Sequence, residues 1–443
     1  MARTRSEYHR VGNEAGVNSG DQGGPPGLCG YSAAMGSGLI ATDVDFERNL
    51  RLIPIHQAMA GLLVWLPVLV LYTTARFGLD GAVLLSALYY LFVVAFELPS
   101  GWMSDRFGRV LTLRIAAGCW VLAHTIFYFG DDRFAWFVVG EMLVAGGFAC
   151  LSGTDVSFHY DTLETTGKVD EYTWRQSRVA TVGFVATAVG SVLGGLLGLI
   201  ELRLIFVASF VFAVGQLVVA SRFVEPSGAS LAKPLVGQLR ACWAYRRDRY
   251  LGWIFLYGVV LVTLEHLPVT LLQPWLTELL GRTADDVGIT PLVSGVLLGV
   301  VFFVGAGAAR LVGPVSQRFG VVATLLGLAV LSAVIVTGMA VWVHGLVVVL
   351  VLFRSAQGSA APVLISQAVA SRVGRGQRAT FLSLDSLAGR LGFGLVLVYL
   401  HGPAARWGLA TVLAWFSILA WVSVGILVTS AIFLRRQAAT NSA

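Results

Sequence analysis

The sequence predicts an all-α integral membrane protein, with twelve transmembrane helices arranged as two six-helix halves. Its 443 residues are 56% apolar and only 13% charged, with a mean hydropathy of +0.76. A soluble domain carries roughly 25% charged residues, so a water-soluble fold of this composition could not cover its surface. Twelve long apolar runs and a pattern that recurs in both halves specify the architecture further.

Each apolar run is close to the length of about 20 residues that a helix needs to cross roughly 30 Å of hydrocarbon. Because a backbone in lipid must satisfy its own hydrogen bonds, we expect all twelve runs to be helical. The predicted spans are 52–75, 81–102, 110–130, 134–154, 178–200, 204–223, 251–275, 289–312, 321–343, 345–368, 379–401 and 408–434.

Lysine and arginine residues predict the orientation, since short cytoplasmic loops are enriched in them. With the N-terminus inside, 23 of the 31 fall in the tails and inner loops, five fall in outer loops and three lie within predicted helices. We therefore expect both termini in the cytoplasm and the chain in the cell membrane. The basic residues form no continuous patch, which argues against a nucleic-acid partner.

The segments outside the helices divide the chain. Residues 1–48 are polar and glycine-rich and are expected to form a disordered cytoplasmic tail. The longest inner loop, 224–250, is expected to link an N-terminal half (49–223) to a C-terminal half (251–434). Residues 435–443 form a second predicted cytoplasmic tail.

A short string recurs between the halves. GWMSDRFG at 101–108 returns as GPVSQRFG at 313–320, an offset of 212 residues. This repeat indicates a duplicated six-helix unit whose two copies have the same orientation.

The strongest local signal lies between the second and third predicted helices. Its glycines permit a tight turn, and its aspartate can accept hydrogen bonds from neighbouring arginines. The segment resembles the inner-loop motif of the major facilitator superfamily, which locks the two halves together on the inner side while the outer side is open. Its second copy has Gln317 in place of the aspartate, which predicts a weaker lock. The motif residues are Gly101, Asp105, Arg106, Gly108 and Arg109.

Two further strings resemble a prokaryotic drug- or metabolite-exporting branch of the same superfamily, and the resemblance covers about 50–435. One contains Asp155 and Asp161 at the inner end of the fourth helix, and the other opens the eleventh helix with Arg378. We expect Arg106 or Arg109 to pair with one of the two aspartates. We also expect Asp105 to brace against the start of the eleventh helix, where free N–H groups and the positive end of the dipole would face it. These residues and the loop motif form the predicted inner gate.

The fifth predicted helix carries Gly190, Gly194 and Gly195. Small residues at this spacing allow another helix backbone to approach closely. The pattern resembles the antiporter motif of drug exporters, although Ser191 replaces its proline. Tight packing alone and an exporter signature both remain open interpretations.

Ionisable side chains at membrane depth are the candidates for transport chemistry, because burying them in lipid is costly. They are Glu141 in the fourth helix, Glu265 and His266 in the seventh, and Arg354 in the tenth. Gln357 follows in a string that resembles the superfamily's helix-four motif. In that family helices one, four, seven and ten line the central cavity, so the resemblance implies that these side chains face one aqueous space.

We expect Glu141 to carry a coupling proton, with Glu265 as the alternative carrier and Arg354 as the group that alternately pairs with the carrier. Three other charged residues within helices are expected to be structural: Glu97, Asp385 and Arg390.

The resemblance implies a secondary active transporter, and we expect a monomer in the lipid bilayer that exports a small organic compound, such as a drug or secondary metabolite, in exchange for protons by alternating access. An importer or a facilitator of a small solute is the alternative. The other classes are a membrane-embedded enzyme or lipid scramblase using Glu265 and His266, and a non-transporting sensor. The sequence has no GxxxxGK[ST] loop for ATP and no CxxC pair among its four cysteines. We expect no cofactor, no metal and no enzymatic activity.

Overall fold

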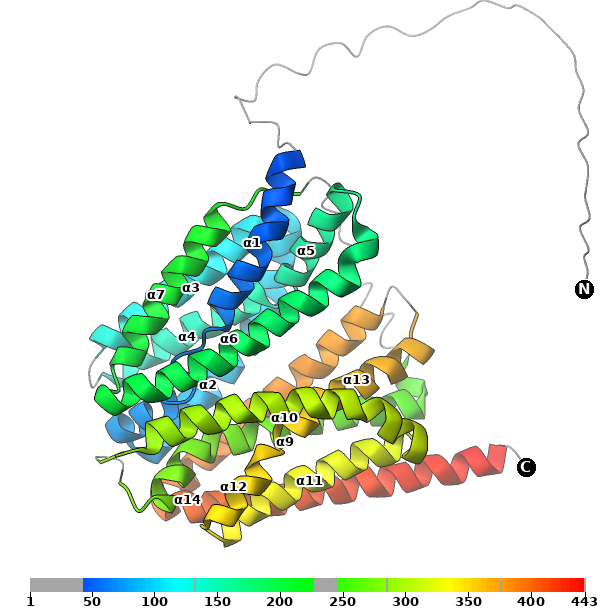
Figure 1. Ribbon diagram of the computed structural model, residues 1–443. Helices are drawn as coiled ribbons and strands as arrows, with labels where there is room; N and C mark the ends of the chain where they lie inside the picture. Colours follow the sequence, from blue (N-terminus) through cyan, green and yellow to red (C-terminus); the bar gives the residue numbers. More distant parts are fainter. Residues whose placement is uncertain (1–42, 131–132, 227–244, 284–285, 375–376, 442–443) are drawn as a thin grey trace, which may run out of the picture. The chain divides into compact units, whose positions relative to one another are not determined.

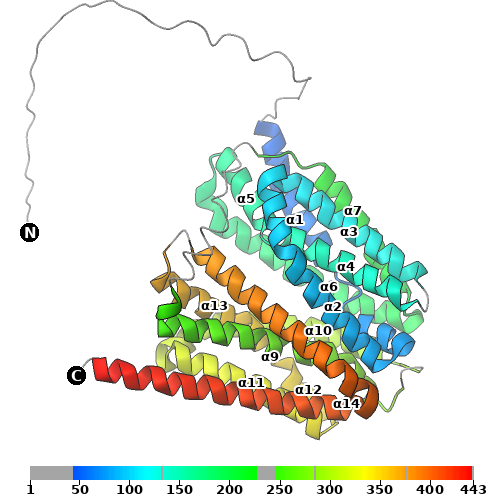
Figure 2. The same cartoon turned by 180° about the vertical axis from the view of Figure 1, so that it is seen from behind.

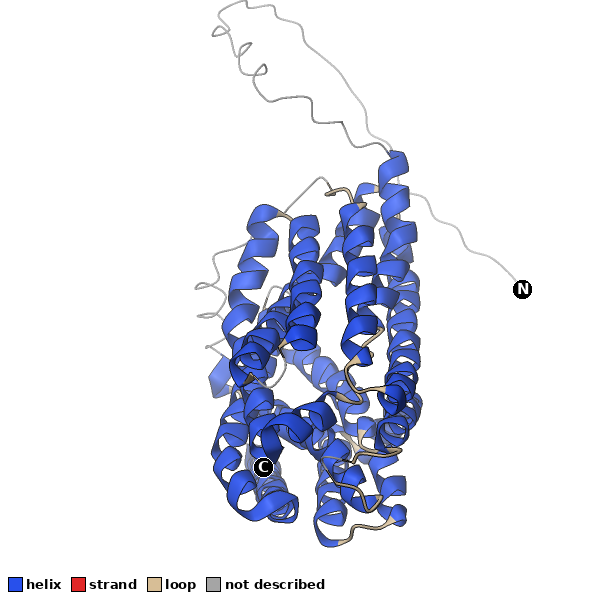
Figure 3. Ribbon diagram, turned by 90° about the vertical axis from the view of Figure 1, so that its left-hand side faces the viewer, coloured by secondary structure: helices blue, strands red, loops and turns tan. Residues whose placement is uncertain are grey.

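The computed structural model describes residues 43–130, 133–226, 245–283, 286–374 and 377–441. Within these ranges the regular structure is helical and contains no strand (Figure 3). Ten of the described helical segments are long and apolar enough to cross a membrane. The predicted all-α membrane fold is therefore confirmed. The predicted disordered tail lies almost entirely outside the described residues, as does most of the predicted linker.

The helices fall into two sets. The first set runs α1 (Asp43–Gly61), α2 (Leu69–Phe107), α3 (Arg109–Phe129), α4 (Phe134–Leu151), α5 (Thr154–Thr165), η1 (Val169–Glu171), α6 (Tyr172–Ile200) and α7 (Leu204–Ser221). The second runs η2 (Tyr245–Arg247), α9 (Arg249–Leu279), α10 (Thr290–Phe319), α11 (Val321–Val341), α12 (Gly345–Leu352), α13 (Ser355–Arg372) and α14 (Arg378–Asn441). We call these the N-terminal and C-terminal sets.

Breaks in the helices relate the ten spans to the twelve predicted ones. Non-helical backbone at Gly78 divides α2, and the same feature at Gly408 divides α14, with φ angles of 73° and 72°. The first predicted span consists of α1 and the start of α2, separated by a non-helical segment at 62–68. Division at these points gives segments that correspond one to one with the predicted spans.

The two sets lie side by side in the fold (Figures 1 and 2). They contact each other mainly through α6 with α10 and through α2 with α14 and α9. The start of α1, the end of α13 and the start of α14 lie toward the predicted inner end. The α9–α10 connection lies toward the opposite, predicted outer end (Figure 1).

The glycines of the fifth predicted helix lie where three helical segments meet. A Cβ on Gly190 would lie 3.0 Å from the backbone at Leu63, in the break after α1. A Cβ on Gly194 would overlap the carbonyl oxygen of Val64 in the same break. On the other side, a Cβ on Gly195 would lie 2.7 Å from the carbonyl oxygen of Pro291 in α10. The motif therefore allows α6 to pack closely against both the first predicted span and the C-terminal set.

A glutamine of α9 also connects the sets at the predicted outer end. The side chain of Gln273 donates to the carbonyl oxygen of Leu66 at 2.9 Å and accepts from the backbone N–H of Leu71 at 3.0 Å. It thereby satisfies two backbone groups that the break in the first span leaves without helical partners. Its side chain is buried, so these bonds hold the two sets together at the predicted outer end.

The predicted topology can be tested on two exposed positions at opposite ends of the fold, Thr283 and Asp170. In a variant without the four native cysteines, we expect Thr283→Cys to react with an impermeant maleimide added outside intact cells. Asp170→Cys should react only after the cells are permeabilised. The reverse accessibility would place the termini outside and contradict the orientation inferred from the lysines and arginines.

Candidate functional site

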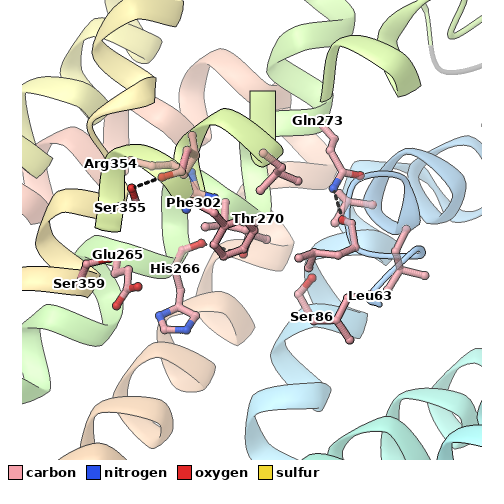
Figure 4. A pocket seen from close by; sticks show the side chains of 18 of the residues that line it. Leu63, Ser86, Glu265, His266, Thr270, Gln273, Phe302, Arg354, Ser355 and Ser359 are labelled. Carbon is pink, nitrogen blue, oxygen red and sulfur yellow. Dashed lines mark hydrogen bonds between the residues drawn. The ribbon is translucent and has the colours of Figure 1, made fainter. Parts of the chain in front are cut away.

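A cavity of about 650 Å³ lies between the two sets of helices. The N-terminal set contributes a mostly apolar wall, and the C-terminal set contributes most of the charged and hydroxyl side chains (Figure 4). Sites for small organic ligands typically occupy about 300–1,000 Å³. The apolar wall includes Leu63, Trp65, Leu66, Leu69, Val70, Phe148 and Phe184, and the opposite wall includes Glu265, His266, Thr270, Arg354, Ser355 and Ser359.

Glu141, Glu265, His266 and Arg354 all line this cavity. The structure therefore brings together four of the five side chains that the sequence suggested for transport. Glu141 and Arg354 are buried, with relative exposures of 5% and 8%. Within the described part of the chain, the side chains of Glu141, Glu265 and Arg354 form no hydrogen bond and no ion pair. Buried charges normally have a hydrogen-bonded or ionic partner. Three charged side chains without such a partner are therefore an unusual feature of this cavity.

The tenth predicted span positions Arg354. Its helix is interrupted between α12 and α13, and Arg354 is the residue that precedes α13. Glu265 of α9 lies against the following turn, because a Cβ on Gly358 would overlap its carboxylate. Glu265 is also the acidic residue whose charge acts on Arg354. Arg354 thus lies near Glu265, and the predicted pairing of Arg354 with Glu141 is not present in this conformation.

Gln357 does not reach the cavity. Its side chain is 1% exposed and accepts a hydrogen bond from Ser332 of α11. The turn of α13 that places Gly358 beside Glu265 directs Gln357 into the packing between α11 and α13. The expectation that Gln357 faces the cavity is corrected accordingly, because the structure gives it a packing position in the C-terminal set; its role in transport stays a prediction.

His266 faces the cavity from the turn that carries Glu265 (Figure 4). Its Nδ1 donates to the carbonyl oxygen of Val262 at 2.9 Å, which leaves Nε2 available to the cavity. Its ring packs edge-on against Tyr90 of α2, with 5.4 Å between centroids. Tyr90 packs in turn against Phe393 of α14 at 4.8 Å. His266 therefore belongs to an aromatic contact between the two sets.

The cavity continues toward the predicted inner end into a second one of about 290 Å³. The two share Tyr89, Tyr90, Phe148 and His266, and Asp155 and Arg390 line only the inner one. Arg390 of α14 donates to Glu97 of α2 at 2.6 Å, with both side chains mostly buried. The sequence suggested structural roles for both residues but gave no indication that they meet across the two sets.

We expect Glu97→Gln to weaken the inner contact between the sets, since a hydrogen bond to a charged group contributes about 1.5–3 kcal/mol. The reversed pair, Glu97→Arg with Arg390→Glu, should restore part of the lost transport. As a control, Arg282→Gln removes an exposed ion pair with Asp286 and should have little effect. Equal transport by wild type and Glu97→Gln would show that the bridge does not govern the conformational change.

The predicted inner gate forms a cluster around Arg109. This arginine donates to Asp105 at 2.5 Å, to Ser104 at 2.9 Å and to Asp161 of α5 at 3.4 Å. The arginine–aspartate pairing that the sequence suggested thus occurs between Arg109 and Asp161. Arg106 is exposed and Gly101 has open space around it.

The other gate residues lie apart from this cluster. Asp155 accepts from the N–H of Val156 at 2.8 Å at the start of α5. Arg378 donates to the carbonyl oxygens of Val373 and Ala370, at the end of α13. The described contacts of Asp105 are with Arg109 only, so the predicted brace against the eleventh helix is absent. Among the described residues, the contacts of the loop motif in this conformation join elements of the N-terminal set only.

Glu225 is a residue of this end that the sequence did not reveal. Its carboxylate accepts from the backbone N–H groups of Arg109 and Val110 at 2.7 and 2.8 Å and so caps α3. Gly108 precedes this helix with a φ of 102°, and a Cβ there would lie 2.9 Å from the carboxyl carbon of Glu225. The glycine of the loop motif is therefore required both by its backbone conformation and by the approach of this cap.

Comparison with known proteins identifies a matching family and solved structures with the same fold. The family model described as the Major Facilitator Superfamily matches residues 55–396. Similar solved structures include the nucleoside transporter NupG, with a TM-score of 0.70 and 13% identity over 87% of this chain and 98% of that one. A D-xylose–proton symporter has a TM-score of 0.61 and 15% identity, covering 86% and 96%. A bacterial homologue of the human lysosomal transporter Spinster, in an inward-facing and unoccupied conformation, has a TM-score of 0.63 and 14% identity, covering 89% and 99%.

No curated protein sequence matches the chain. The structural identities are low enough that they establish the fold alone. The family match, however, spans most of the chain and includes the first eleven predicted spans in whole or in part. This multi-pass membrane protein belongs to the Major Facilitator Superfamily of transporters.

Proposed function

We propose that the chain is a proton-coupled secondary transporter of a small organic compound, which acts as a monomer in the cell membrane with both termini in the cytoplasm. One observation carries this proposal: Glu141, Glu265 and Arg354 line one cavity between the two sets and lack hydrogen-bonded partners among the described residues. Charges within a membrane are costly and are retained where they bind or move ions and substrates.

The proton would be carried by a carboxyl group of the cavity. Such a group favours its neutral form where water is excluded and its ionised form beside a cation. Movement of α9 relative to α13 would change the distance between Glu265 and Arg354, and hence how far the arginine balances the charge of this carboxylate. Arg354 itself keeps its charge. Glu141, on the N-terminal set, is the second carboxyl group that could take the proton, and the sequence had favoured it.

Alternating access would use the two ends differently. In the present conformation α6 packs on α10. At the predicted outer end, Gln273 donates a hydrogen bond to the carbonyl oxygen of Leu66 in the break of the first span. The loop motif makes its contacts within the N-terminal set at the inner end. These contacts correspond to a state closed toward the outside. The opposite state requires α6 and α10 to separate and the loop motif to engage the C-terminal set.

The direction of transport is proposed as export, following the exporter-like strings at Asp155, Asp161 and Arg378. Import or facilitated diffusion is the second candidate. The names of two similar structures, a nucleoside transporter and a D-xylose–proton symporter, support a small polar solute and proton coupling and do not favour export. Enzymatic use of Glu265 and His266 is disfavoured, because the family model that matches most of the chain is one of transporters.

Vesicle transport of a mixture of metabolites tests the proposal. Right-side-out and inverted vesicles containing the chain would be incubated in a cell extract, with and without a pH gradient, and the compounds taken up would be compared by mass spectrometry. We expect at least one small compound to accumulate in only one vesicle orientation and only with the gradient. If no compound depends on the chain, transport is contradicted; if one does so regardless of the gradient, facilitated diffusion replaces proton coupling.

A further inference from the structure

Arg354 is a buried cation that has no partner in the described part of the chain. Its side chain is 8% exposed, lines the cavity, and leaves Nε without a hydrogen bond. A guanidinium offers five donors in a planar fork that matches a carboxylate or phosphate. Burying a guanidinium without an acceptor has an unfavourable free energy, unless a ligand supplies the acceptor during the transport cycle.

The helix that begins beside Arg354 adds to this preference. Arg354 directly precedes α13, an 18-residue helix whose first residue is Ser355. The N-terminus of a helix carries a partial positive charge, although the N–H of Ala356 in this first turn already donates to the carbonyl oxygen of Phe353 at 3.0 Å. Ser355 faces the same cavity (Figure 4). A positive side chain and the positive end of a helix therefore coincide on one wall.

The acidic residues of the cavity do not cancel this charge permanently. Glu265 acts on Arg354 electrostatically but makes no ion pair with it. A glutamate can become neutral by taking a proton, whereas an arginine cannot lose its charge. When the carboxyl groups hold protons, the charge that remains in the cavity is positive.

The opposite wall determines the rest of the ligand. The N-terminal set lines the cavity with apolar side chains of the first predicted span and with Phe148 and Phe184, and it also contributes the carboxyl group of Glu141. Burying an apolar group there is favourable by about 25 cal/mol per Å². A ligand that satisfies both walls has an acidic group at one end and an apolar or aromatic body at the other.

We infer that the solute is a small amphipathic organic acid, whose carboxylate binds the guanidinium of Arg354 and whose apolar body lies against the first predicted span. This inference rests on the proposed function and specifies its substrate class. Glu265 competes with the bound carboxylate for Arg354.

Three probes with the same phenylbutyl body test the inference: 4-phenylbutyrate, 4-phenylbutyramide and 4-phenylbutylamine. Binding to the purified full chain can be followed by tryptophan fluorescence, since Trp65 lines the cavity. We expect the acid to bind about tenfold or more tightly than the amide, because charge-assisted hydrogen bonds are roughly twice as strong as neutral ones. Equal affinities, tighter binding of the amine or the absence of binding by all three would overturn the inference.

Variants separate binding by Arg354 from a structural role. Arg354→Gln should abolish the preference for the acid, and Glu265→Gln should strengthen binding of the acid, because it removes the competing charge. Arg310→Gln, at an exposed arginine of α10 outside the cavity, should leave both unchanged. If Arg354→Gln does not fold, the three-probe comparison on the wild type still decides. Retention of the preference in folded Arg354→Gln would contradict the inference.

The same probes distinguish this failure from failure of the proposed function. If liposomes containing the chain respond to the amide or amine with proton movement but not to the acid, the substrate class is wrong and proton-coupled transport stands. If neither these probes nor any compound from the vesicle screen moves protons, the proposed function itself fails.

Discussion

Glu265→Gln is expected to abolish accumulation of the solute against its gradient while leaving downhill exchange intact. A pH difference of one unit supplies about 1.4 kcal/mol per proton, which is enough for about tenfold accumulation. Glutamine keeps the shape of the side chain but cannot carry the proton. With the solute identified in the vesicle screen, the accumulation ratio should fall from about tenfold to about one. Proteoliposomes with imposed pH gradients provide the measurement.

Glu141→Gln, tested in parallel, decides which carboxyl group is the carrier. If Glu141→Gln loses accumulation and Glu265→Gln does not, the proton resides on the N-terminal set, as the sequence first suggested. Glu278→Gln is the matched control, because Glu278 is an exposed glutamate further along α9 that does not line the cavity. Normal accumulation by both cavity variants would eliminate a carboxyl-based proton pathway.

Gly195→Val is expected to stop the transport cycle by preventing closure of the predicted outer end. Its Cβ would lie 2.7 Å from the carbonyl oxygen of Pro291 and 3.0 Å from Cα of Leu292, and backbone atoms cannot move aside as a flexible side chain can. Overpacking costs about 1–3 kcal/mol, which changes the ratio of two conformations about 5–150-fold. We expect a population shifted toward the state open to the outside, measured by spin-label distances between α6 and α10.

Gly118→Val tests whether this effect depends on the site. Gly118 lies in α3 with no atom within 4 Å of its Cβ position, so the same substitution should leave the distances and the transport rate nearly unchanged. An unaltered distance distribution in Gly195→Val would mean that the contact between α6 and α10 does not control the outer end.

The sequence predicted the helical segments well because lipid imposes a length and a composition on each of them. Positions 101–108 and 313–320 were recognisable because tight turns and basic loops depend on local sequence. The cavity-lining positions of Glu141, Glu265, His266 and Arg354 were also predicted, since charges at membrane depth are rare and the resemblance specifies which helices face inward.

The contacts that depend on long-range packing could not be predicted. The only local signals of the break after α1 are Gly61, just before it, and Pro67 within it. The two hydrogen bonds of this region to Gln273 join positions that are 202 and 207 residues apart in the sequence. The pair of Glu97 with Arg390 spans 293 residues. Gln357 was included among the transport candidates because the string from Arg354 to Gly358 resembles the superfamily's helix-four motif. Its burial against Ser332 of α11 depends on the packing of α13 on α11, which the local sequence does not specify.

Proton flux driven by the solute itself tests whether transport is coupled to protons. Proteoliposomes would contain the chain and an internal pH dye, with the solute gradient as the only driving force. We expect downhill movement of the solute to change the internal pH in wild type and Glu278→Gln, and we expect Glu265→Gln to move the solute without a pH change. Solute movement by the wild type with no change in internal pH would contradict proton coupling through this cavity.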